Sequence, residues 1–121
     1  MGLDNFASKS EVISKLSDKD VKAFKKENIN LCEGMFSDGE VSFRGKVYAM
    51  VVLEITGVSL FDYWIPPEKV YEMWQDFENC NLEKFANDHP GIRYSDSDSV
   101  NELRKLFMVS AKCKLGLVAS W

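Results

Sequence analysis

The chain has 121 residues, of which 45% are apolar, so it holds enough hydrophobic material for one core and is too short for two ordinary domains. Its 15 basic and 19 acidic residues give a net charge of −4, which argues against a general nucleic-acid or anionic-membrane binder. We therefore expect one soluble globular domain over residues 1–121 that binds neither nucleic acid nor a membrane.

The cysteines and the N-terminal segment favour a cytoplasmic protein. Cys32, Cys80 and Cys113 fit neither a disulfide framework nor a CxxC zinc motif, so we expect free thiols and no metal site. The first residues have neither the basic region nor the apolar run of a signal peptide. The longest apolar stretch, residues 47–53, is far shorter than the roughly 20 residues that a membrane span needs. No nucleotide-binding loop is present in the sequence, so no cofactor is expected.

The first quarter of the chain predicts two short helices. After a short apolar arm at Leu3 and Phe6, apolar residues alternate with lysines over residues 8–28, which indicates helical segments. Ser17 is placed to cap the second of them, with Phe24 on its inner side.

A structured loop is expected next, followed by a central helix. The loop covers residues 29–40 and contains the turn sequence Ser-Asp-Gly at 37–39. Helical spacing of apolar residues up to Gly57 predicts a helix over residues 43–56. Because residues 47–53 are apolar almost all round, this helix should lie at the centre of the core, surrounded by others. A buried strand is the alternative.

Three more helices are predicted in the second half. The proline pair at 66–67 begins the clearest of them, since proline is favoured in the first helical turn. Asn81 caps a short helix. Ser99, with Glu102 three residues later, forms a capping box for a last helix, which Gly116 stops.

The chain ends in an apolar segment, residues 117–121, that would be costly to leave in water. We expect it to return along the domain beside the short extended segment 58–65, with Trp121 packed. The predicted fold is mostly α, a single compact helical domain, with room for a small two-stranded β ribbon of residues 58–65 and 117–121.

The sequence Ser-Phe-Arg-Gly-Lys at residues 42–46 departs from local preference. Two cations and a glycine occupy the first turn of a predicted helix, where the dipole repels positive charge and glycine costs about 1 kcal/mol. A phosphate or carboxylate held by the helix amides and both cations would reconcile these features. The alternative is that Asp38 and Glu40 neutralise the cations while Gly45 admits a crossing helix. The candidate ligand-binding residues are Ser42, Arg44, Gly45, Lys46, Tyr48 and Cys32.

Structural roles are favoured for the other chemistry-bearing residues, and no catalytic residue is assigned. A thiol–imidazole pair of Cys32 and His89 is formally available, but an inert cysteine and a loop histidine are the favoured interpretation. Five aromatic residues are assigned to the core rather than to a ligand cage: Phe61, Tyr63, Trp64, Trp74 and Trp121.

Several blocks of the sequence resemble one known family. They are Met1–Asn5, Leu31–Ser37 leading into Ser42–Tyr48, Ile55–Leu60, Trp64–Pro67, and the ending Leu115–Leu117 with Trp121. On these blocks the whole chain resembles a family of small, functionally uncharacterised bacterial and phage-type proteins, whose pattern has Gly where this chain has Glu33. The resemblance implies no activity.

The sequence favours a small non-enzymatic interaction or regulatory module that takes a protein partner. The alternative is a binding protein or enzyme for a small anionic ligand, a phosphate or a carboxylate, that uses the helix start at residues 42–46.

Overall fold

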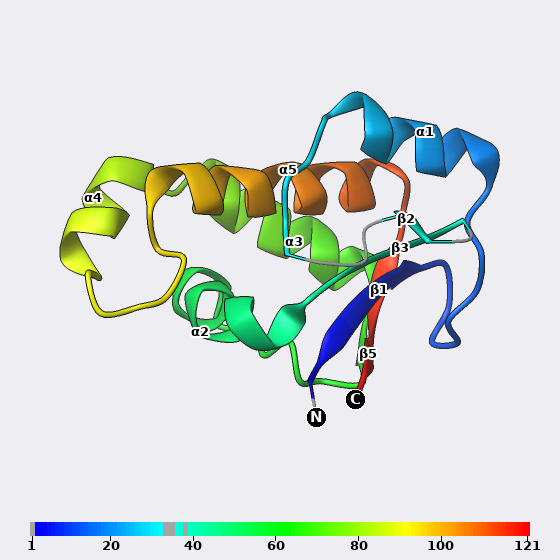
Figure 1. The fold of residues 1–121 in the computed structure, drawn as a ribbon, viewed down its shortest axis with the longest axis horizontal. Helices are drawn as coiled ribbons and strands as arrows, with labels where there is room; N and C mark the ends of the chain where they lie inside the picture. The colour runs from blue at the N-terminus through cyan, green and yellow to red at the C-terminus, as the bar shows by residue number, and fades with distance from the viewer. Residues whose placement is uncertain (1, 33–35, 38) are drawn as a thin grey trace.

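The computed structural model describes residues 2–32, 36, 37 and 39–121, which form helices on a five-stranded antiparallel sheet (Figure 1). The strands follow the order β2-β3-β1-β5-β4 across the sheet. Their bounds are β1 Asp4–Ser8, β2 Phe36–Ser37, β3 Glu40–Phe43, β4 Trp64–Ile65 and β5 Gly116–Ser120. The helices are α1 Asp18–Lys26, α2 Gly45–Thr56, α3 Pro67–Glu78, α4 Leu82–Asp88 and α5 Ser97–Lys112.

The prediction of a mostly α domain was wrong, because the chain forms a mixed α/β domain. The N-terminal arm is the central strand β1, which pairs with β3 on one side and β5 on the other. Residues 58–65 and 117–121 do pair, through Trp64 with Val118 and Ile65 with Leu117, but as one edge of a larger sheet. The polar residues of β1 gave it little strand signal.

The helices pack on one face of the sheet, and that face forms the main core. Asn5 lies opposite Phe43 in β3 and Ala119 in β5, and all three side chains are buried. Helices α3 and α5 lie side by side above them, with the rings of Phe77 and Phe107 stacked 5.0 Å apart (Figure 1).

The opposite face of the sheet carries a small apolar strip. Val118 pairs with Phe6 on one side and with Trp64 on the other, and it is buried. The ring of Trp64 lies over Gly116, where a Cβ atom would collide with it. Gly116 therefore starts β5 and does not stop the preceding helix, contrary to the sequence-based prediction.

Only one of the two helices predicted over residues 8–28 is present in the described chain. It is α1, and Ser17 caps it by accepting a hydrogen bond from the backbone N–H of Asp20 at 3.2 Å, as predicted. Phe24 is buried, also as predicted. Residues 9–16 contain no helix, and the N–H of Leu16 instead donates to the carbonyl of Gly39. Asp38, in the predicted turn, lies outside the described residues.

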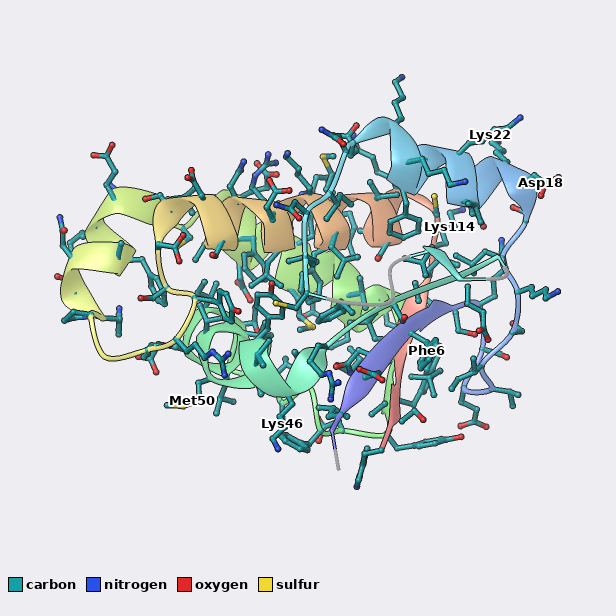
Figure 2. The ribbon with its side chains drawn as sticks, viewed as in Figure 1. Phe6, Asp18, Lys22, Lys46, Met50 and Lys114 are labelled. Atoms are coloured by element: carbon teal, nitrogen blue, oxygen red, sulfur yellow. The ribbon has the colours of Figure 1, made fainter. Side chains whose placement is uncertain are left out.

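Helix α2 lies close to its predicted range and ends at Gly57, whose φ of 75° suits glycine in the left-handed region. Its predicted position at the centre of the core was wrong. Tyr48, Val51 and Val52 are buried, whereas Met50 is 64% exposed. Figure 2 shows Met50 on the outer side of the helix. The apolar residues of α2 therefore lie partly on its buried side and partly on its exposed side.

Helices α4 and α5 each begin at a residue whose side-chain oxygen accepts a hydrogen bond from the backbone N–H three residues later. Asn81 caps α4 as predicted, accepting from the N–H of Lys84 at 3.1 Å. Helix α5 begins earlier than predicted, because Asp96 is its cap and accepts from the N–H of Ser99. The predicted capping box was therefore wrong, and Glu102 instead accepts a hydrogen bond from the N–H of Asn30 at 2.6 Å.

Within the described chain, no helix has both the length and the apolar character that crossing a membrane requires.

Candidate functional site

The predicted site lies where β3 runs into α2. Ser42 is a buried residue of β3, and Arg44 is the residue that caps α2 without a side-chain hydrogen bond to the helix. The Nε atom of Arg44 lies 3.5 Å from Oδ1 of Asp4 in the neighbouring strand β1. Asp4 therefore supplies negative charge beside Arg44, a role that the sequence-based alternative gave to Asp38 and Glu40.

Gly45 is explained by a side chain of β1. A Cβ atom at Gly45 would collide with Oδ1 of Asn5, so this position requires a residue without a side chain. The Nδ2 group of Asn5 donates to the carbonyl of Leu60 at 2.9 Å, which fixes the amide in that place. The crossing element at Gly45 is therefore the buried Asn5 side chain, not a helix.

Two backbone N–H groups at the start of α2 already donate hydrogen bonds to carbonyl groups of the chain. The N–H of Lys46 donates to the carbonyl of Leu3 at 3.1 Å, and the N–H of Arg44 donates to the carbonyl of Cys32 at 3.0 Å. The Lys46 side chain lies on the exposed outside of α2 (Figure 2). The two cations of the predicted anion site thus differ in surroundings, since Arg44 lies beside a carboxylate and Lys46 extends into solvent.

Cys32 and Tyr48, two of the predicted residues, are in direct contact. The hydroxyl of Tyr48 accepts a hydrogen bond from the N–H of Cys32 at 3.1 Å. The Sγ atom of Cys32 lies 3.3 Å from the hydroxyl of Tyr94, and the two tyrosine rings are 4.8 Å apart. Burial, followed by the hydrogen bond with Cys32, raises the pKa of Tyr48 well above its usual range. Tyr48 therefore stays protonated and ties the loop at Cys32 to α2.

Tyr94 was missed by the sequence analysis. It lies 62 residues from Cys32 in a loop before α5, and the guanidinium of Arg93 lies over its ring at 5.2 Å. No local pattern relates two such distant positions. The thiol–imidazole pair of Cys32 and His89, which the sequence analysis did not favour, is not formed, since His89 stacks on Phe85 and lies 3.2 Å from Oε1 of Glu54.

The three cysteines are free, as predicted. Burial raises the pKa of the Cys80 thiol. Burial, with a further contribution from Asp20, raises the pKa of Cys113 to about 11. Both thiols are therefore weak nucleophiles near neutral pH. In the part of the chain that is described, no three His, Cys, Asp or Glu side chains gather as they would around a metal ion.

Two cavities lie away from the β3–α2 junction. One, of about 290 Å³, opens between the end of α2 and the start of α3, with Trp64 and Lys69 in its walls. The other, of about 250 Å³, lies beside α4, between Cys80 and His89. None of the six predicted ligand-binding residues lines either cavity.

Three aromatic residues that the sequence analysis wrongly assigned to the core, Phe61, Tyr63 and Trp121, are exposed, and together they are called the aromatic patch. The N–H of Ala119 donates to the carbonyl of Tyr63 at 2.9 Å, which places Tyr63 beside the end of β5. Trp121 is 62% exposed, and its ring contacts that of Phe61 edge to face at 6.2 Å. The hydroxyl of Tyr63 donates to the carbonyl of Glu11 at 2.9 Å. The patch lies where the segment leading into β4 meets the end of β5, near the C terminus in Figure 1.

Comparison with protein-family models, with curated proteins and with solved structures gave no match. The resemblance to small bacterial and phage-type proteins therefore stays a prediction.

Proposed function

We propose that this chain is a non-enzymatic interaction module that binds a partner protein through the aromatic patch of Phe61, Tyr63 and Trp121. The observation that carries the proposal is the contact of Trp121 with Phe61 at the surface, where the two rings are 62% and 49% exposed. Covering such exposed aromatic rings with a partner is favourable, because it removes on the order of 100 Å² or more of apolar surface per ring from water.

The residue types of the patch support binding of a protein. Tryptophan and tyrosine are enriched among the residues that contribute most to protein–protein affinity. The hydrogen bond from Tyr63 to Glu11 holds that ring in one place, so less conformational entropy is lost when a partner binds.

The charges around the patch indicate the chemistry of the partner. Asp62, between two of the aromatic residues, is exposed, and so is Glu11 beside Tyr63. A partner segment that combines apolar and basic side chains would cover the rings and complement both carboxylates.

A peptide-display selection on the immobilised chain tests this proposal. We expect enrichment of peptides that combine aromatic or aliphatic residues with Lys or Arg, and calorimetric titration should then give a saturable heat of binding. The variant Phe61→Ser/Trp121→Ser should lose at least about tenfold in affinity, because it removes the two exposed rings.

Tyr71→Ser is the matched control. Tyr71 is an exposed aromatic residue on α3, 51% exposed, and it lies outside the patch. Its replacement should leave the affinity unchanged. Enriched peptides that bind the double variant as tightly as the wild-type chain would refute the patch, provided that both proteins unfold at the same denaturant concentration.

An anion-binding role at the start of α2 has less support. Arg44 lies beside Asp4, and Asn5 fills the space over Gly45. The N–H groups of Arg44 and Lys46 donate to carbonyl groups of the chain itself. These contacts leave fewer N–H donors and less positive charge to bind a phosphate or carboxylate than the sequence predicted.

A further inference from the structure

The outer face of α2 carries an apolar stripe where a surface helix is usually polar. Met50 and Leu53 are 64% and 49% exposed, and Lys46 and Gly57 continue the same line of the helix at spacings of four, three and four residues. Residues at this spacing share one side of an α-helix. The opposite side, with Tyr48 and Val51, is buried in the domain.

The charges on this helix are the reverse of what an isolated helix favours. Its first turn contains Lys46 and no acidic residue, while its last turn contains Glu54 and no basic residue. The helix dipole favours negative charge at the N-terminus and positive charge at the C-terminus. His89 approaches Glu54 from the end of α4, so one contact within the chain offsets part of this arrangement.

An antiparallel second copy of the same helix fits both features. We propose that two copies of this chain associate through α2, with the two helices antiparallel about a two-fold axis at Met50. The exposed apolar side chains of the two helices then cover each other. Lys46 of each copy lies toward the C-terminal end of the other helix, beside Glu54.

Symmetry makes this pairing self-complementary. Lys46 and Glu54 each lie four residues from Met50, on either side. An antiparallel two-fold pairing centred on Met50 therefore sets Lys46 of one copy opposite Glu54 of the second copy, twice in the dimer. The dipoles of the two helices also oppose each other, which is favourable.

The length of the helix sets the strength of the association. Twelve residues form a helix about 18 Å long, so the contact is smaller than a standard specific interface. The dimer is therefore weak, and it forms and dissociates with protein concentration. This surface is separate in sequence from the aromatic patch, and the inference does not rest on the proposed function.

Sedimentation equilibrium over a range of concentrations tests the proposal. The weight-average mass of the wild-type chain should rise from 13.8 kDa toward twice that value as the concentration approaches about 1 mM. Met50→Glu should keep the chain monomeric, because it places a charge at the centre of the apolar contact.

Charge reversal distinguishes the antiparallel pairing from other modes of association. Lys46→Glu and Glu54→Lys should each weaken dimerisation at least about tenfold, because each sets like charges opposite one another. The double variant Lys46→Glu/Glu54→Lys should restore it. Tyr71→Ser and Phe61→Ser/Trp121→Ser should dimerise as the wild-type chain does, which separates this surface from the aromatic patch.

A wild-type chain that remains monomeric up to about 1 mM overturns the proposal, and so does a double variant no better associated than the single variants. Circular dichroism and the denaturation midpoint of each variant show that it is folded. Because Lys46, Met50 and Glu54 are exposed, these substitutions should leave the fold intact.

Discussion

Deletion of residues 117–121 is expected to abolish cooperative folding of the domain. Strand β5 pairs with β1 on one side and with β4 on the other, so its loss separates the sheet into two parts. Leu117, Val118 and Ala119 are all buried. Their apolar surface and the lost strand pairing amount to about 5 kcal/mol or more, which is comparable to the whole stability of an ordinary domain. Far-UV circular dichroism during urea titration is the measurement.

Replacement of the exposed end alone is the control for this deletion. Trp121→Ser should change the free energy of unfolding by less than about 1 kcal/mol, because the ring is 62% exposed. A truncated chain that still unfolds cooperatively, at a urea concentration close to the wild-type midpoint, would show that β5 is not an essential strand.

Gly45→Ala is expected to destabilise the domain by about 2 kcal/mol, although alanine inside a helix normally stabilises it by up to about 1 kcal/mol. The reason is the collision of the new Cβ with Oδ1 of Asn5, whose amide is held by the carbonyl of Leu60. The free energies of unfolding of the wild-type and variant chains, from urea titration, give the effect.

A double-mutant cycle isolates the contact behind that effect. Asn5→Ala alone should also destabilise the domain, because it removes a buried hydrogen bond. Gly45→Ala should then cost much less in the Asn5→Ala background than in the wild-type chain. Equal costs in both backgrounds would show that Asn5 is not the reason for glycine at this position.

Local patterns in the sequence predicted most helices correctly. Gly57 ended α2, the proline pair at 66–67 began α3 and Asn81 capped α4, since each of these residues acts through its own backbone geometry or its own side chain. The pairing of residues 58–65 with the C-terminal segment was also predicted, because an apolar end needs cover.

The sheet as a whole could not be predicted in this way. Strand β1 contains Asp4, Asn5 and Ser8, which have little strand preference, and its burial depends on neighbours that lie far along the chain. The same limit applies to the contact of Cys32 with Tyr94. An apolar run in a helix also does not show whether the helix is surrounded by others or has an exposed apolar side. For this reason Met50 was predicted to be buried, although it is exposed.

The most direct measurement of the proposed interaction follows Trp121 itself. Fluorine-19 NMR of fluorotryptophan-labelled protein resolves the tryptophan rings, and Trp121→Phe assigns the resonance of interest. Addition of a selected basic, apolar peptide should shift the Trp121 resonance saturably and reduce its sensitivity to replacement of H2O by D2O, because the exposed ring becomes covered. A peptide that binds with the Trp121 resonance unchanged would contradict the aromatic patch as the docking surface.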